Sequence, residues 1–138
     1  MNDRPNDIKR IRPEIGSIKT FQQMGSEEKF QNQTLRPIIK LQNPLLLAVF
    51  QNYIVKHKGV FYDLSLEKRL AYIENAIFKD QKFRNALKGM IIGHFTVKEY
   101  NDYAQHSSSL NKRMMNMVVE RLKNQVEYFE SNEKRRVI

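Results

Sequence analysis

The three histidines have the most chemically versatile side chains in this sequence, because imidazole serves as a metal ligand and as a general acid or base near neutral pH. His57, His94 and His106 do not stand four residues apart with an acid between them, the spacing that a helical metal-binding pair needs. His57 lies between two lysines, and His94 continues an apolar helical stripe. We therefore predict structural roles for these two and keep only His106 as a candidate for chemistry.

Nucleophiles, acid–base carboxylates and phosphate loops form no recognisable set. The chain has no cysteine, which excludes thiolate metal sites, disulfides and cysteine nucleophiles. It also has no glycine-rich phosphate loop; Ala86, Gly89 and Gly93 instead predict a groove in which another helix packs closely. Glu99 ends the pattern Thr96-Val-Lys-Glu, a helix-capping box. The sequence predicts no catalytic, cofactor-binding or metal-binding residue.

Basic residues without neighbouring acids are the main indication of a binding surface. Arg84 and Lys88 stand four apart on one helical face, a mildly unfavourable arrangement that an anion would relieve. Residues 81–95 hold three basic residues and no acidic one. Plain solubility is the alternative explanation for such residues. We predict that an acidic partner contacts six positions: Arg10, Arg12, Arg84, Lys88, Lys112 and Arg113.

The charge distribution favours an acidic protein surface over nucleic acid as that partner. The chain contains 24 Lys or Arg against 15 Asp or Glu, a formal net charge of +9. This excess is spread over several segments, whereas nucleic-acid binders concentrate it in a patch or stripe. The longest purely apolar run, residues 45–50, is too short to span a membrane, and the amino terminus does not resemble a secretory signal. We expect a cytoplasmic protein without a membrane partner.

The elements that must position these residues form one domain and an arm. A chain of 138 residues, 41% of them hydrophobic, is long and apolar enough for a single core. In residues 1–25, two prolines and two glycines argue against a continuous helix, so we expect an extended or partly disordered arm. Its isoleucines recur at spacings of three or four, which predicts docking on its own domain or on a partner: Ile8, Ile11, Ile15 and Ile18.

Residues 26–138 carry helix signals throughout and no strand-like alternation. Pro37 is expected to kink or restart the first helix. The segment from Pro44 to about Lys58 is apolar nearly all round and predicts the most buried helix, ended by Gly59. The predicted start signals are Ser26, Asn43-Pro44, Ser65, Asp80, Thr96 and the serine triplet 107–109. The pattern predicts an all-α fold, a compact bundle of about six helices with an extended amino-terminal arm.

Two other functions stay open alongside a non-catalytic protein-interaction or scaffolding module. Residues 96–121 have a helix–turn–helix outline, although the serine triplet supplies neither the glycine nor the apolar residues typical of that turn. This outline would suit a nucleic-acid-associated protein. A small enzyme would instead require a closed polar pocket that gathers His94 or His106 with Glu99 or Asp102.

Three segments, 30–44, 82–96 and 110–117, resemble a family of small uncharacterised all-helical bacterial proteins. The resemblance covers about residues 28–125 and leaves the arm outside. Some members carry an automatic glyoxalase name, which would imply a metal enzyme. This chain has neither the strand-rich modules nor the spaced His and Glu ligands of metal-dependent glyoxalases, so the resemblance implies a helical unit and transfers no catalytic residue.

Substitutions should separate the core stripes from the surface. Leu70→Ala and Leu122→Ala should each lower the free energy of unfolding by about 2–5 kcal/mol if their stripes are buried. Arg84→Glu should change it by no more than about 0.5 kcal/mol if its face is solvated. Urea unfolding of the three variants checks this, and equal losses in all three would contradict the assigned faces.

Overall fold

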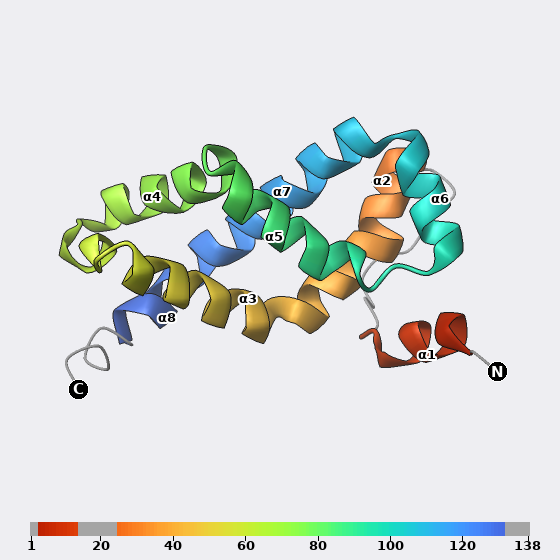
Figure 1. The fold of residues 1–138 in the computed structure, drawn as a ribbon, viewed down its shortest axis with the longest axis horizontal. Coiled ribbons are helices and arrows are strands. Elements are labelled where there is room, and N and C mark those ends of the chain that lie inside the picture. The colour runs from red at the N-terminus through yellow and green to blue at the C-terminus, as the bar shows by residue number, and fades with distance from the viewer. Residues whose placement is uncertain (1–2, 14–24, 132–138) are drawn as a thin grey trace.

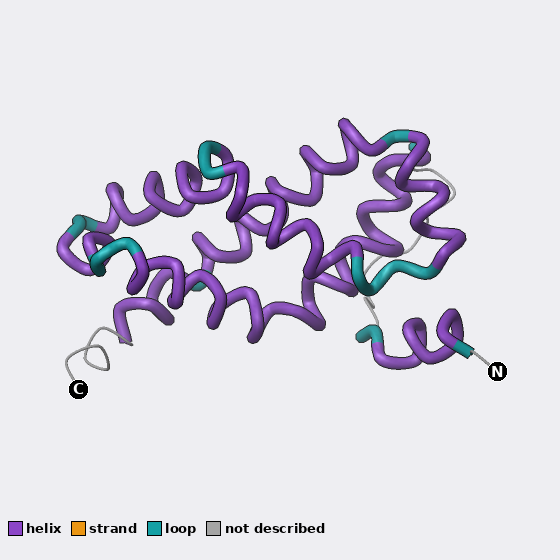
Figure 2. The backbone as a smooth tube through the Cα atoms, viewed as in Figure 1, coloured by secondary structure: helices purple, strands orange, loops and turns teal. Residues whose placement is uncertain are grey.

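The computed structural model describes residues 3–13 and 25–131 (Figure 1). Within these ranges the chain forms helices joined by short turns and contains no strand, which confirms the predicted all-α class (Figure 2). α1 and α8 lie at opposite ends of the elongated body (Figure 1). The elements are α1 (Arg4–Ile11), α2 (Ser26–Phe30), the π-helix η2 (Gln31–Leu35), α3 (Arg36–Lys56), the 3₁₀-helix η3 (Val60–Asp63), α4 (Leu66–Phe78), α5 (Gln81–Ile92), α6 (Val97–Gln105), α7 (Ser107–Asn124) and α8 (Val126–Ser131).

One continuous helical stretch runs through α2, η2 and α3. Pro37 does not restart it but occupies the first turn of α3, directly after the π-helix. A proline cannot donate to the carbonyl four residues earlier, and its ring crowds that carbonyl. The wider turn of a π-helix just before the ring accommodates both effects.

Asn43-Pro44 does not start a helix, contrary to our expectation, because α3 runs through both residues. Pro44 and Lys40 are exposed, so water can reach the carbonyl that loses its helical donor. The Asn43 side chain instead exchanges two hydrogen bonds with Gln125, at 2.9 and 2.7 Å. Gly59 does follow the end of α3, in the left-handed conformation with φ of 66°.

α3 supplies the centre of the hydrophobic core, as predicted. The fully buried Phe50 ring lies 6.0 Å from Phe61 and 5.1 Å from Phe129, measured between centroids. α3 packs against α5 and α7, and α4 packs against the same two helices. Aromatic pairs at these separations add to the free energy gained by burying their area.

The helix faces differ from the predicted stripes at particular positions. Leu45 is 49% exposed, so α3 is not buried all round. Leu66, the first residue of α4, is 58% exposed, so the apolar stripe expected around Leu70 does not extend to the start of that helix. Leu122 is fully buried and Leu70 half-buried, which places the expected cost of Leu122→Ala at the upper end of its range and that of Leu70→Ala at the lower end.

The middle of the small-residue face of α5 has no close neighbour. A Cβ atom added to Gly89 would find nothing within 4 Å, and Ala86 is exposed. The predicted close approach of another helix is therefore wrong at Gly89 among the residues that the structure covers.

Local capping explains where several helices begin. Ser65 accepts a hydrogen bond from the amide of Lys68, and Asp80 accepts one from that of Phe83, as predicted. Thr96 and Glu99 form the predicted capping box. The serine triplet is different: α7 already begins at its first serine, because the single residue His106 makes the whole turn from α6.

The arm is helical where the structure describes it, which corrects our expectation of an extended segment. α1 has Pro5 in its first turn, and Pro13 follows shortly after its end. Proline is well suited to the first turn, because the amide it lacks would have no helical partner there. Ile15 and Ile18, also assigned to the arm, lie outside the described residues.

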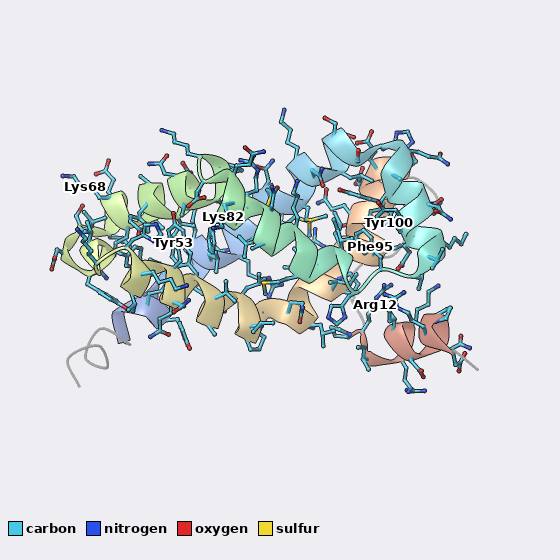
Figure 3. The ribbon with its side chains drawn as sticks, viewed as in Figure 1. Arg12, Tyr53, Lys68, Lys82, Phe95 and Tyr100 are labelled. Atoms are coloured by element: carbon cyan, nitrogen blue, oxygen red, sulfur yellow. The ribbon has the colours of Figure 1, made fainter. Side chains whose placement is uncertain are left out.

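Arg12 fastens the arm to its own domain. Its guanidinium donates to both carboxylate oxygens of Glu99, at 2.7 and 2.6 Å, and to the carbonyl of His94 at 2.8 Å. The two charged side chains are only 8% and 14% exposed, and Ile8 is buried beside them on α1. Figure 3 shows Arg12 between α1 and the domain. Intramolecular docking, one of the two predicted roles of the arm, is therefore observed.

Glu99 joins three segments of the chain. Besides Arg12, it accepts hydrogen bonds from the Thr34 hydroxyl of η2 and from the Thr96 amide that opens α6. Burial alone would raise the pKa of the Glu99 carboxyl. The hydrogen bonds and the charge of Arg12 outweigh it and bring the pKa below its usual value.

This pair should make stability pH-dependent. Because the folded-state pKa of Glu99 is lowered, its contribution is complete above the unfolded pKa of about 4.3 and is lost as pH falls through the folded value. A double-mutant cycle of Arg12→Gln and Glu99→Gln, measured by urea unfolding, should give a coupling of about 1.5–3 kcal/mol at pH 7. The coupling should vanish under strongly acidic conditions.

Arg10→Gln is the matched control, since the Arg10–Asp7 ion pair is exposed and should contribute less than about 1 kcal/mol. A coupling between Arg12 and Glu99 that persists unchanged at low pH would contradict the assignment.

Candidate anion-binding cleft

An arginine-rich cleft of about 650 Å³ lies between η2–α3 on one side and α7 on the other. Its volume falls within the range of small-ligand and peptide side-chain sites. Arginines and side-chain amides dominate the lining. The lining residues are Gln31, Arg36, Ile39, Arg113, Asn116, Met117, Glu120, Arg121, Asn124 and Gln125.

Helical periodicity explains why α7 presents these residues together. Arg113, Met117 and Arg121 follow one another at steps of four, and Asn124 continues the same face. Side chains three or four residues apart lie on one side of a helix. The other side of α7 carries two methionines, two valines and two leucines that are buried in the core.

The π-helix η2 orients two of the three guanidinium groups. Asn32 Oδ1 accepts hydrogen bonds from Arg36 Nε at 3.2 Å and Nη2 at 3.1 Å. Gln31 Oε1 accepts one from Arg113 Nη1 at 2.7 Å. Arg113 Nε also forms a long, partly exposed ion pair with Glu27 Oε1, at 3.8 Å. Neighbouring residues of one π turn thus hold an arginine of α3 and an arginine of α7.

Arg121 is the least compensated charge of the cleft. It is half-buried, and no acceptor for its guanidinium occurs among residues 3–13 and 25–131. Burial lowers the pKa of Arg121 below its ordinary value, and the positive charge of Arg36 lowers it further. The side chain nevertheless stays protonated at neutral pH. Two like charges therefore line one cleft, and neither forms an ion pair with a carboxylate of the described residues.

One end of the cleft is rigid. Gln125 is held by its amide pair with Asn43 and donates from Nε2 to the carbonyl of Arg121 at 3.0 Å. Ile39, only 1% exposed, forms part of the floor. Because these side chains are already fixed by hydrogen bonds, less conformational entropy is lost when a ligand binds beside them.

The chemistry available here is binding rather than proton transfer. Guanidinium groups do not exchange protons near neutral pH, but they donate paired hydrogen bonds to carboxylates and phosphates. Glu120 is the single carboxylate of the lining, and it is exposed. No cluster of three or more potential metal ligands occurs in the described part of the chain. The geometry fits an anionic ligand.

Of the six predicted partner-binding residues, the structure places only Arg113 in this cleft. Lys112 is its exposed neighbour on α7, and Lys88 is half-buried on α5. Arg84 donates to the carbonyl of Phe78 at 2.8 Å, which closes the end of α4 and adds to the expected cost of Arg84→Glu.

The two predicted residues of the arm have contacts within their own chain. Arg10 forms an exposed ion pair with Asp7, and Arg12 is committed to Glu99. A further role for either in binding a partner stays a prediction.

Sequence reasoning missed Arg36 and Arg121, which complete the site. Arg36 precedes a proline, and Arg121 stands among charges of both signs in the last long helix. The usable signal was the spacing of eight residues between Arg113 and Arg121, which puts both on one side of α7. Nothing local to Arg36 indicated that it would face the same helix.

The geometry supports the two alternatives, a small enzyme and a helix–turn–helix protein, less well than it supports anion binding. One groove is lined by Glu99, Asp102 and His106, but the last two are exposed, so it is not a closed pocket. The Glu99 carboxylate already accepts hydrogen bonds from Arg12, Thr34 and Thr96. A general-base role therefore finds no support at Glu99. The turn between α6 and α7 is one residue, His106, whereas a helix–turn–helix has a turn of three or four.

Comparisons with protein-family models, with curated proteins and with solved structures found no match for this chain. The resemblance to small uncharacterised helical bacterial proteins therefore stays a prediction. None of the described helices is long and apolar enough to cross a membrane.

The repulsion between Arg36 and Arg121 should be measurable as lost stability. Arg121→Gln should raise the free energy of unfolding by a few tenths to about 1 kcal/mol at low salt, because it removes a half-buried like charge. Added salt should shrink this gain. Lys112→Gln, which removes an exposed charge from the same helix, is the control and should show little change. A loss of stability in Arg121→Gln would show that the guanidinium has a compensating partner.

Proposed function

We propose that this protein is a non-catalytic helical interaction module that binds an acidic segment of a partner protein in the arginine-rich cleft, and that it acts in the cytoplasm. The observation that carries the proposal is the shared placement of Arg36, Arg113 and Arg121 in one cleft. Arg121 has no acceptor among the described residues, and Arg36 has donors left over after Asn32. Such an arrangement binds carboxylates more strongly than the same charges dispersed over a surface.

A protein partner is favoured over nucleic acid for two reasons. First, the cleft is short and carries the carboxylate of Glu120, whereas a nucleic-acid groove follows several phosphates with uninterrupted positive charge. Second, α6 and α7 lack the turn of a helix–turn–helix. The exposed Lys112 beside the cleft can extend contacts along an acidic peptide.

Binding of a fluorescein-labelled peptide of alternating Glu and Gly, followed by anisotropy, tests the proposal. Arg36→Gln and Arg121→Gln should each weaken binding about tenfold, since a lost charged hydrogen bond costs roughly 1.5–3 kcal/mol. Lys68→Gln removes an exposed positive charge of α4, outside the cleft, and should stay within about twofold of the original affinity. Circular dichroism and thermal unfolding of each variant show whether it remains folded.

Two results would contradict this function. Equal weakening by all three variants would indicate diffuse charge attraction rather than a site. Tighter binding of a single-stranded RNA or a DNA duplex than of the peptide, with a steep dependence on salt, would favour the nucleic-acid alternative.

A further inference from the structure

The free donors of the cleft converge from opposite walls. A guanidinium carries five N–H donors in a planar fork. Arg36 donates twice to Asn32, which leaves three donors, and Arg121 donates to no described residue. Arg36 stands on α3 and Arg121 on α7, so a ligand between them receives hydrogen bonds from two sides.

The charges of the cleft favour a ligand with two negative charges. Arg113 is already attracted to Glu27, but Arg36 and Arg121 have no carboxylate within ion-pair distance among the described residues. One carboxylate neutralises only half of this pair. A phosphate monoester carries a charge of about −1.5 to −2 at pH 7 and three acceptor oxygens arranged tetrahedrally. It can therefore receive a forked arginine contact on each side.

We propose that the space between Arg36 and Arg121 is a phosphate pocket that receives a phosphorylated serine or threonine side chain of the acidic partner segment. This inference rests on the proposed function, because it names the group of the partner that the cleft selects. Recognition of phosphorylated peptides by clustered arginines follows the same physical rule. The cleft volume of about 650 Å³ exceeds what a phosphate alone needs, so neighbouring peptide residues fit beside it against Met117.

Glu120 allows a substitution that should strengthen, rather than weaken, anion binding in the pocket. Its carboxylate belongs to the same lining and repels any anion that enters. Glu120→Gln keeps the size of the side chain and removes its charge. This variant should therefore bind a phosphorylated ligand several-fold more tightly, opposite in direction to the arginine variants.

Three peptides of one acidic sequence, differing at the central position as phosphoserine, Glu or Ser, separate the pocket from general charge attraction. Isothermal titration calorimetry should give at least about tenfold tighter binding for phosphoserine than for Glu. Arg36→Gln and Arg121→Gln should reduce this preference to about twofold or less, while Lys68→Gln keeps it. The preference should also fall between pH 7 and pH 5, as the phosphate gains a proton near pH 6.

The failures are distinguishable. Equal affinity for the phosphoserine and Glu peptides would overturn the phosphate pocket and leave the binding of acidic segments standing. Absence of binding by all three peptides to the folded original protein would overturn both. Free O-phosphoserine or inorganic phosphate that binds as tightly as the phosphopeptide would assign the pocket to a small phosphorylated ligand and overturn the peptide source.

Discussion

The π-helical turn at Gln31–Leu35 links the two parts of the molecule that lie outside the main core. Its side chains leave the helix in different directions: Thr34 reaches Glu99, which holds the arm, whereas Gln31 and Asn32 hold the arginines of the cleft. A π-helix joins residues five apart by hydrogen bonds, whereas an α-helix joins residues four apart, so the π turn is wider. Such turns are frequent at functional sites. Both the docked arm and the candidate cleft therefore depend on one local departure from α-helical geometry.

Two arginines of this chain illustrate how surroundings decide the use of the same side chain. Arg12 is nearly buried, but it meets a carboxylate, a carbonyl and a favourable geometry, so it fastens α1 to the domain. Arg121 is half-buried beside Arg36 and meets no acceptor among the described residues. Stability accounts for the first arrangement. We expect the second to lower stability, which agrees with our proposal that an anion binds there.

The aromatic core is built from residues outside the cleft. Phe50, Phe61 and Phe129 form a connected cluster, and Tyr53 donates to Asp80 at the start of α5. These contacts fix α3 against η3, α5 and α8, and none of them uses an arginine of the cleft. Burial and the charge and hydrogen bond of Asp80 raise the pKa of Tyr53 to about 12, so this contact stays intact over the neutral range.

Sequence by itself determined the features that depend on neighbours within one helical turn. The caps at Ser65, Asp80 and Thr96 were predictable, because a side chain and an amide three residues away are always close at a helix start. The central position of α3 followed from its apolar composition, and the burial of Leu122 followed from its place in a helical stripe. Tertiary structure alone decided that α3 continues through Pro44, that Arg12 meets Glu99, and that Arg36 faces Arg121. These contacts join segments far apart in the chain, and their energy depends on packing, dielectric surroundings and water, which no local pattern of residues specifies.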